Sequence, residues 1–342
     1  MVSTLNMMVN DVRRYISYNF KKDTRLKNKP HIFVIESTNH CNLDCVMCPR
    51  RYMKRKPEHM KFELFKKIID ESKDFVYEVG LDLYGEPLLS PDIFKMIRYA
   101  KEVGINNTAM STNAVLLTEE NAKKIFESGL DVLVIDFDAF TKENYEKIRR
   151  GAKYETVLKN VKRFAELKTE EEKMGNNKPY TILQIIEMKR TEHEVDRWID
   201  FWKEYPFHLQ VKRFNTRTQQ HKDITQLSEE WQRVRTNQKR QPCSFLWEMM
   251  VFGSNGNVST CCNDYDIKLD LGNVKEQSVL EIWNGEKFRK LRELHKKGIY
   301  PSICKNCLEW KGNPKYAFWK EMKFIRTLKI FHIFMEKKVQ YV

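Results

Sequence analysis

The 342-residue sequence lacks any apolar run long enough to span a bilayer. Residues 1–19 contain no uninterrupted apolar stretch of the kind found in a secretory signal peptide. No internal repeat is visible, so a repeat architecture is not expected. Since the chain is neither short nor visibly exported, we do not expect its eight cysteines to form a disulfide framework. A reducing, cytoplasmic setting is expected instead, in which cysteines more often serve metal or redox chemistry.

The formal net charge of +14 is concentrated at the two ends of the chain. Residues 1–30 carry seven Lys and Arg against two Asp, and residues 313–342 carry seven Lys and Arg against two Glu, so each end contributes +5. The two ends thus hold 10 of the 14 excess charges. This distribution argues against a continuous basic groove, and no nucleic-acid partner is expected. It predicts tails that approach an anionic partner, such as a membrane surface.

Short apolar runs alternate with helical patterns between residues 31 and 214. Strands are expected at residues 31–36, 79–84, 107–111, 132–137, 181–187 and 209–214. Helices are expected at residues 62–73, 93–103, 119–128, 142–149, 154–167 and 194–203. Such alternation predicts parallel strands joined by right-handed crossovers. We therefore expect an α/β fold, a partial (β/α)6 TIM-like barrel whose active site lies at the carboxyl ends of the strands.

Three cysteines, Cys41, Cys45 and Cys48, directly follow the first expected strand with C-x3-C-x2-C spacing. Thiolates are soft ligands for iron–sulfur clusters, which usually take four of them. Three closely spaced thiolates suggest a cluster with one iron left open. A structural zinc site is an alternative, although such sites usually pair two C-x2-C knuckles, and buried free thiols are another.

This cysteine spacing resembles the signature of the radical SAM superfamily. In that family the three cysteines hold a [4Fe–4S] cluster, and its open iron is chelated by the amino and carboxylate groups of S-adenosylmethionine (SAM). The resemblance independently implies the partial barrel, with the cysteine loop at the carboxyl end of its first strand.

Several strand ends resemble the SAM-binding positions of the family. The turn Gly85-Glu86-Pro87 resembles the one that binds the SAM amino group, although an ordinary strand-to-helix turn is the alternative. Tyr84 stands where the family usually has a glycine, and it is expected to narrow the cleft. Thr112 and Asn113 are further implied SAM contacts, with an ordinary Asn-containing turn as the alternative. Asp138 is another implied contact.

The fourth strand end, Asp136-Phe-Asp138, departs from the family pattern, because Asp136 replaces a serine that would contact SAM. A carboxylate facing the lumen would repel the SAM carboxylate unless it is protonated or paired. An oxidation of an alcohol to a ketone would need a base for the hydroxyl proton, and Asp136, Glu187 and Lys212 are candidates by position only. The stretch Tyr145–Gly151 resembles a Y-x-x-I-R-G segment common in relatives, which supports this alignment.

The remaining cysteines form a second set near the carboxyl end. A predicted β-hairpin ends at Cys261 and Cys262, a helix is expected at residues 279–297, and a C-x2-C knuckle follows. This order resembles the SPASM or twitch domain, which implies a second, fully ligated [4Fe–4S] auxiliary cluster. Spacing favours Cys261 over Cys262 as a ligand, and zinc is again the alternative. The implied ligands are Cys243, Cys261, Cys304 and Cys307.

Together these features predict a radical SAM oxidoreductase that removes a hydrogen atom from a sugar, cyclitol or sugar nucleotide and oxidises or epimerises it. A fully ligated second cluster suits electron transfer to or from the substrate radical, as in the 2-deoxy-scyllo-inosamine dehydrogenase type that the arrangement resembles. An electron donor such as flavodoxin or ferredoxin is expected. The alternatives are a maturase of a ribosomally made peptide and a non-catalytic metal-binding scaffold.

The expected organisation has five parts: a basic lead-in (1–28), the radical SAM core (29–215), a linker (216–242), the auxiliary cluster domain (243–312) and a basic amphipathic tail (313–342). The lead-in is expected to form a partly amphipathic helix. The tail mixes aromatic, aliphatic and lysine residues, so it either lies at a membrane interface or packs over the open edge of the barrel.

Overall fold

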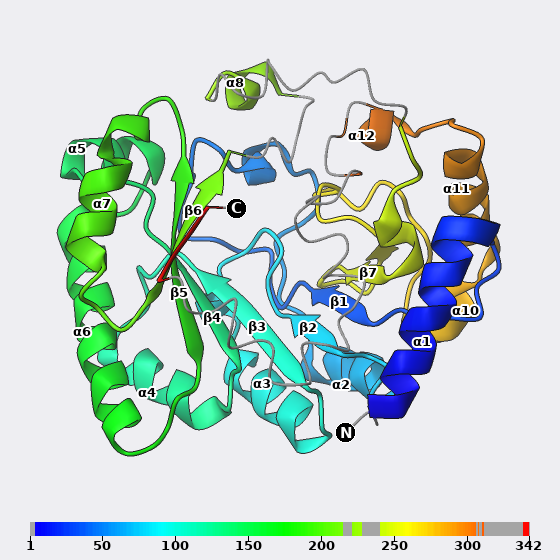
Figure 1. Ribbon diagram of the computed structural model, residues 1–342, viewed down its shortest axis with the longest axis horizontal. Coiled ribbons are helices and arrows are strands. Elements are labelled where there is room, and N and C mark those ends of the chain that lie inside the picture. Colours follow the sequence, from blue (N-terminus) through cyan, green and yellow to red (C-terminus); the bar gives the residue numbers. More distant parts are fainter. Residues whose placement is uncertain are drawn as a thin grey trace.

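The computed structural model describes residues 4–214, 221–227, 240–305, 307, 310 and 338–341. Within these residues a single nine-stranded sheet forms the centre, in the order β8-β7-β1-β2-β3-β4-β5-β6-β9 (Figure 1). The mixed α/β architecture, with its parallel sheet arranged as a partial barrel, confirms the expected fold class.

Six of these strands are the expected barrel strands, and neighbours among them run parallel. They are β1 (Ile32–Ile35), β2 (Glu78–Gly80), β3 (Asn107–Thr112), β4 (Val132–Asp136), β5 (Tyr180–Glu187) and β6 (His208–Arg213). The expectation was wrong for β2, which ends at Gly80 rather than at Tyr84. Beyond Gly80 the carboxylate of Asp82 takes the place of a backbone acceptor and binds the amide of Ser111 at 2.9 Å.

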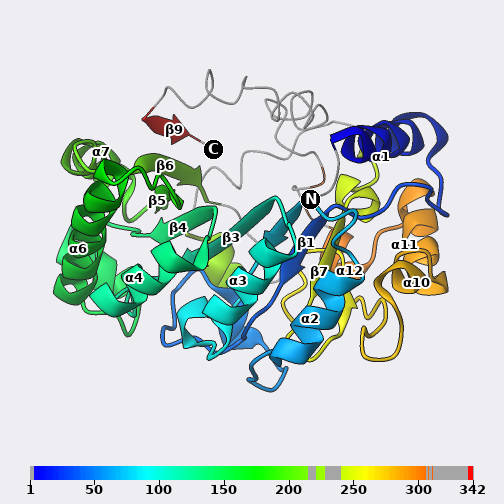
Figure 2. The same ribbon diagram turned by 90° about the horizontal axis from the view of Figure 1, so that it is seen from below.

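The expected helices cover the outer face of the sheet (Figure 2). They are α2 (Phe62–Asp70), α3 (Ile93–Glu102), α4 (Glu119–Ser128), α5 (Lys142–Ile148), α6 (Tyr154–Lys173) and α7 (Val195–Trp202). In α2 the apolar stripe is buried at Phe65, Ile68 and Ile69. Burial of such stripes against the sheet supplies most of the stability of short helices.

Strand alternation divides β4 between the helix layer and the inner face of the sheet. Leu133 and Ile135 are fully buried, and Phe137 of the same parity packs against Tyr145 of α5 and Trp202 of α7. Side chains of the opposite parity, including Asp136, therefore point to the inner face. The same division applies along β5 and β6.

The second cysteine region begins with the expected hairpin, β7 (Met249–Phe252) and β8 (Val258–Ser259). β7 also pairs in parallel with β1, so the hairpin extends the barrel sheet without a break. The expected single helix at 279–297 was wrong. The structure has α10 (Val279–Trp283) and α11 (Glu286–Lys296), separated at Gly285, where a Cβ atom would lie 2.9 Å from the carbonyl oxygen of Glu281.

At the amino end, α1 (Thr4–Ile16) continues into a π-helical turn at Ser17–Lys21, which agrees with the expected lead-in helix. The other short helices are α8 (Lys222–Thr225), within the expected linker, and α12 (Ser302–Lys305). None of the helices in the described ranges is long and apolar enough to cross a membrane.

The expected tail falls largely outside the described residues. Its last part forms β9 (Val339–Tyr341), which pairs in parallel with β6. For these residues the prediction that the tail covers the open edge of the barrel is confirmed. The remainder of the tail, residues 313–337 and 342, lies outside the described ranges.

Candidate active site

The loop after β1 brings Cys41, Cys45 and Cys48 together. Its backbone is held to the end of α5, because the amide of Val46 donates to the carbonyl of Ile148 at 3.0 Å. The amide of Cys48 donates to the carbonyl of Cys45 at 3.1 Å, which tightens the loop. The Cys45 thiol interacts electrostatically with both Cys41 and Cys48, so the three sulfur atoms form one group.

The chemistry of this group fits an iron–sulfur cluster. Burial raises the pKa of Cys45 to about 12 and also raises the pKa values of Cys41 and Cys48. Because the thiolate is the form that binds iron, loading the site must release these protons. Three soft sulfur donors on one loop leave one position of a four-iron cluster for another ligand.

The turn after β2 is pressed against the cysteine loop at Gly85. A Cβ atom at this position would lie 2.1 Å from the carbonyl oxygen of Thr38, so only glycine can occupy it. The next amide, that of Glu86, donates to the carbonyl of His40 at 2.7 Å. Pro87 then begins a short 3-10 turn. The Gly85-Glu86-Pro87 motif therefore forms a close contact between the segment after β2 and the loop after β1.

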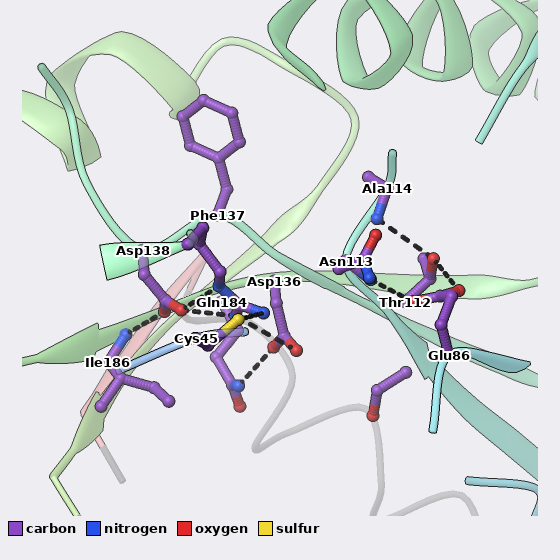
Figure 3. Close-up of polar contacts among 12 residues, drawn as sticks. Cys45, Glu86, Thr112, Asn113, Ala114, Asp136, Phe137, Asp138, Gln184 and Ile186 are labelled. Carbon is purple, nitrogen blue, oxygen red and sulfur yellow. Dashed lines mark hydrogen bonds and ion pairs between the residues drawn. The ribbon is translucent and has the colours of Figure 1, made fainter. Parts of the chain in front are cut away.

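The side chain of Glu86 is buried beneath the end of β3. One carboxylate oxygen accepts the Thr112 hydroxyl at 2.7 Å, and the other accepts the Asn113 amide at 2.9 Å (Figure 3). Burial, with a smaller contribution from Asp136, nevertheless raises the pKa of Glu86 to about 7. The structure thus brings together Glu86, Thr112 and Asn113, three of the residues predicted to contact SAM.

Asn113 connects this group to the cysteine loop. Its side-chain nitrogen donates to the Asn42 side-chain oxygen at 2.9 Å and lies 3.9 Å from the sulfur of Cys41. Its side-chain oxygen accepts the amide of Val115 at 3.0 Å. Asn113 therefore links the two groups: its side chain lies beside the thiol of Cys41, and its backbone amide binds the carboxylate of Glu86.

The end of β4 places two carboxylates around one buried guanidinium. Arg149 donates through Nε to Asp138 at 2.6 Å, and its Nη2 lies 3.3 Å from Asp136. Asp138 also accepts the amide of Ile186 at 2.8 Å. Burial acts to lower the pKa of Arg149, but Asp138, Cys45 and Asp136 together raise it well above its usual value. The pairing that the sequence required of Asp136 is thus present.

Arg149 is the site residue that sequence reasoning missed. It is buried, and its Nη1 lies 3.8 Å from the sulfur of Cys45, so it joins the end of β4 to the cysteine loop. The Y-x-x-I-R-G resemblance contained the signal, because an arginine at a helix end is directed at the same strand ends.

A row of polar side chains crosses the inner face of the sheet. Asp136 lies opposite Gln184, and Gln184 lies opposite Gln210 of β6. The Gln184 amide donates to Asp136 at 2.8 Å (Figure 3). Lys212, two residues beyond Gln210, shares this inner face by strand alternation. Glu187 has the parity of the buried Leu183 and Ile185, so alternation places it on the other face, apart from Asp136.

The second set of thiols gathers beside the hairpin. The thiol of Cys243 interacts electrostatically with Cys304 and Cys307, and that of Cys261 interacts with Cys243. Asn263 links the set, because its backbone amide donates to Cys261 at 3.3 Å and its side chain donates to Cys307 at 3.7 Å. Burial raises the pKa of Cys304 to about 12. The eight cysteines, all within the described part of the chain, form no disulfide bonds.

In the described part of the chain, no three His, Cys, Asp or Glu side chains converge closely enough to hold one metal ion. A four-iron cluster bonds each thiolate through a different iron, so its ligands stand further apart.

An apolar cluster lies between the two sets of thiols. It contains Ile32, Leu83, Tyr84, Met249, Val251 and Tyr265, and both Cys48 and Cys262 pack against it. The hydroxyl of Tyr84 donates to the carbonyl of Cys262. The rings of Tyr84 and Tyr265 pack edge to face, with their centroids 6.1 Å apart. Tyr84, in the position usually held by glycine, therefore connects the Gly85 turn to the second cysteine loop.

Two family models match the chain. The radical SAM superfamily model matches residues 35–201, and the SPASM model, described as an iron–sulfur cluster-binding domain, matches residues 243–308. The first match contains Cys41, Cys45 and Cys48, and the second contains all four predicted auxiliary ligands. These matches favour iron–sulfur clusters over zinc at both sets.

Several curated proteins are similar to this chain. A tungsten-containing aldehyde ferredoxin oxidoreductase cofactor-modifying protein from Pyrococcus furiosus is 26% identical over 324 residues, covering 80% of this chain and 86% of the relative. A probable GTP 3′,8-cyclase from Methanococcus maripaludis is 32% identical over 138 residues, covering 40% of this chain and 46% of the relative. The chain thus spans most of the first relative and less than half of the second.

Solved structures share the fold. Streptococcus suis SuiB bound to its precursor peptide SuiA superimposes with a TM-score of 0.62 at 16% identity, covering 86% of this chain and 80% of SuiB. BtrN in complex with AdoMet and 2-DOIA superimposes with a TM-score of 0.52 at 20% identity, covering 80% of this chain and 89% of BtrN.

Proposed function

Because the chain belongs to the radical SAM superfamily and carries an iron–sulfur cluster-binding SPASM domain, we propose that it is an oxidoreductase acting on a polyhydroxylated small molecule. The substrate class is a sugar, cyclitol or sugar nucleotide. The reaction removes a hydrogen atom from a carbon that bears a hydroxyl or amino group. The polar row Asp136–Gln184–Gln210 is the observation that carries this proposal.

The residues at the strand ends fit the cofactors of the family. Cys41, Cys45 and Cys48 would hold the first [4Fe–4S] cluster, and the Glu86 carboxylate would receive the amino group of SAM. When bound and reduced, this cluster and SAM supply the 5′-deoxyadenosyl radical, and an auxiliary cluster supplies one-electron transfer. Arg149 fixes the cysteine loop against β4.

The inner face of the sheet is chemically divided, and this division supports a substrate position on the β4–β6 side. On the β1–β7 side it is filled by the apolar cluster around Tyr84. On the β4–β6 side it presents Asp136, Gln184 and Gln210 in one row. Amide and carboxylate groups spaced across neighbouring strands offer donors and acceptors to several hydroxyls at once. A polyhydroxylated ring matches this row of hydrogen-bond donors and acceptors.

Asp136 is the proposed proton acceptor of the oxidation. Converting a secondary alcohol to a ketone removes one hydrogen atom, one electron and one proton from the substrate. Asp136 stands at the end of the polar row and is half-buried, so its carboxylate can reach a substrate hydroxyl. Arg149 and Gln184 hold the carboxylate in place. Lys212 on the same inner face is a second candidate, and Glu187 stays a prediction from position alone.

The auxiliary ligands can be assigned by a matched pair of variants. We propose Cys261 as the fourth ligand because its thiol interacts with Cys243, whereas Cys262 packs on the apolar cluster. Cys261→Ser should then lower the iron content after reconstitution from about eight to about four atoms per chain, and Cys262→Ser should leave it near eight. The reverse result would assign Cys262.

The relatives support the class of reaction and define its main competitor. BtrN was solved with AdoMet and 2-DOIA, and SuiB was solved with a precursor peptide. Both likenesses extend over most of this chain. We favour a small-molecule substrate because the described inner face offers the polar row. A flavodoxin or ferredoxin stays the expected electron donor.

Deuterium transfer tests the proposal. The chain is reconstituted anaerobically, and about eight irons per chain and release of 5′-deoxyadenosine are expected. It is then incubated with deuterated sugars, cyclitols and sugar nucleotides, and with deuterated peptides in parallel. Deuterium in 5′-deoxyadenosine from the carbohydrate set supports the proposal, and deuterium only from peptides contradicts it. Asp136→Asn should retain deuterium transfer but lose ketone formation by at least about a hundredfold.

A further inference from the structure

The helix α1 is amphipathic, but it exposes its apolar stripe to solvent and turns its polar side toward the rest of the protein. Five large apolar side chains form one stripe along α1 and its π-helical extension, and they are between 40% and 72% exposed: Leu5, Val9, Val12, Ile16 and Phe20. With Tyr15, this segment holds six of the ten exposed large apolar side chains in the described residues. A surface helix of a soluble domain normally turns such a stripe toward the core.

The polar face of α1 is the one that docks on the protein. Arg14 is buried and lies 3.5 Å from Glu248, and the Asn10 side chain accepts the amide of Lys29 at 2.7 Å. Tyr18 donates to the carbonyl of Pro242 at 2.8 Å. The orientation of the helix is therefore fixed by polar contacts, and the apolar stripe is left exposed. The helix itself lies at the periphery of the molecule (Figure 1, Figure 2).

The fully exposed charged side chains around the stripe are all positive. Arg13, Lys21, Arg25, Lys27 and Lys29 are exposed, whereas Asp11 and Asp23 are only half-exposed, and Asp11 pairs with Arg14. Along the helix, Arg13 stands beside Val9 and Ile16, and Lys21 follows Phe20. An apolar stripe bordered by cations suits a surface that is apolar inside and anionic outside.

We propose that α1 binds the surface of a membrane containing anionic lipids, with Leu5, Val9, Val12, Ile16 and Phe20 inserted among the lipid chains. Arg13 and Lys21 then meet the headgroups. Charge decides against two other occupants of the stripe. Residues 313–342 carry a net +5, as do residues 1–30, so the tail and a second copy of this helix are both repelled.

Vesicle co-sedimentation tests the surface. The reconstituted full chain is mixed with phosphatidylcholine vesicles and with phosphatidylcholine–phosphatidylglycerol vesicles. We expect binding to the second kind only, weakened by added salt. The double variant Val12→Asn, Phe20→Asn should lower the partition coefficient at least tenfold, because it loses the favourable free energy of burying two apolar side chains in the lipid.

The matched control is Met174→Asn, because Met174 is 72% exposed but lies outside α1. This control should bind like the parent chain, and circular dichroism and iron content should be the same for all three proteins. Binding by the double variant at the parent level would assign the contact to another part of the chain and overturn the proposal. So would equal binding to phosphatidylcholine alone, absence of binding, or dimerisation that the double variant abolishes.

Discussion

At the scale of single residues, the site contrasts two buried carboxylates at neighbouring strand ends. Glu86 is surrounded by neutral donors, and its pKa is raised to about 7. Asp138 is paired with Arg149. Ionising a buried carboxylate costs free energy when no cation lies beside it, so a cation that binds next to Glu86 stabilises the ionised form. An incoming ammonium group would provide that cation.

We expect Glu86→Gln to weaken SAM binding at least about tenfold and to stabilise the SAM-free chain at alkaline pH. Because burial raises the pKa of Glu86 in the folded chain above its ordinary value of 4.5, its contribution to stability is complete below about pH 4.5. It is lost as the pH rises through about 7, and Gln escapes this loss. Urea unfolding of both proteins at about pH 5 and about pH 8 measures the difference, expected at about 1–3 kcal/mol.

Glu127→Gln is the control, because Glu127 is exposed on α4. It should change neither SAM affinity nor the pH dependence of unfolding. An unchanged SAM affinity in Glu86→Gln would contradict the assigned role.

Arg149 provides the complementary prediction. Arg149→Met leaves Asp138 buried without its cation, which should lower the free energy of unfolding by about 3–5 kcal/mol. Arg150→Met is the matched control, because the neighbouring Arg150 side chain is exposed, and it should change stability by less than about 0.5 kcal/mol. The double variant Arg149→Met, Asp138→Asn should recover part of the loss. Equal denaturant midpoints for the two single variants would show that the buried pair has no such role.

At the scale of elements, the cysteine loop is clamped from two sides. The end of α5 binds its backbone at Val46, and the turn after β2 presses on it at Gly85. In both contacts the group that holds the loop comes from outside the cysteine motif. The geometry of the three thiols therefore depends on the ends of two other elements.

Gly85→Ala should displace the cysteine loop, because the new Cβ would meet the carbonyl of Thr38. After anaerobic reconstitution we expect about four of about eight irons to be lost. Gly80→Ala is the control, since a Cβ there has its nearest neighbour at 3.8 Å, and it should reach the full iron content. A full complement of iron in Gly85→Ala would show that the loop tolerates the contact.

At the scale of the whole molecule, the two cysteine regions share one structure. β7 pairs directly with β1. The fully buried Glu36, just after β1, binds Arg55 at 2.6 and 2.7 Å and accepts the amide of Ser254 at 3.1 Å. Arg55 also donates to the carbonyl of Tyr265 at 2.9 Å. The loop after β1 is thus joined to the hairpin turn and to the loop beyond Cys262.

Arg55→Met should therefore loosen both regions together. It leaves Glu36 buried without a cation, and a loss of about 3–5 kcal/mol is expected. Hydrogen exchange should accelerate in β1 and in β7, because both border Glu36. Lys54→Met, which changes an exposed neighbour, should leave both rates unchanged. Acceleration confined to residues 50–56 would show that the two regions are independent.

The local elements could be predicted because each carries its own pattern. The stripe Phe65, Ile68 and Ile69 repeats with the helical period, and the six strands are bounded by turn residues. The spacing of Cys41, Cys45 and Cys48 contains ligand chemistry that needs no partner elsewhere in the chain. These features predicted the fold class, the family and the cofactors, all of which the fold and the comparisons confirm. The roles of the other site residues and the domain boundaries stay predictions.

What the sequence determined by itself is the set of side chains that avoid water and the type of metal chemistry that the thiols suit. Tertiary structure alone decided which distant groups meet: Arg149 with Asp136 and Asp138, Gln210 with Gln184, and β7 with β1. It also decided that α1 turns its apolar stripe outward. The physical reason is that periodicity shows that a helix has two faces, but the partners that satisfy the polar face come from remote parts of the chain. Only when Glu248, Pro242 and Lys29 are in place does it become clear which face is left exposed.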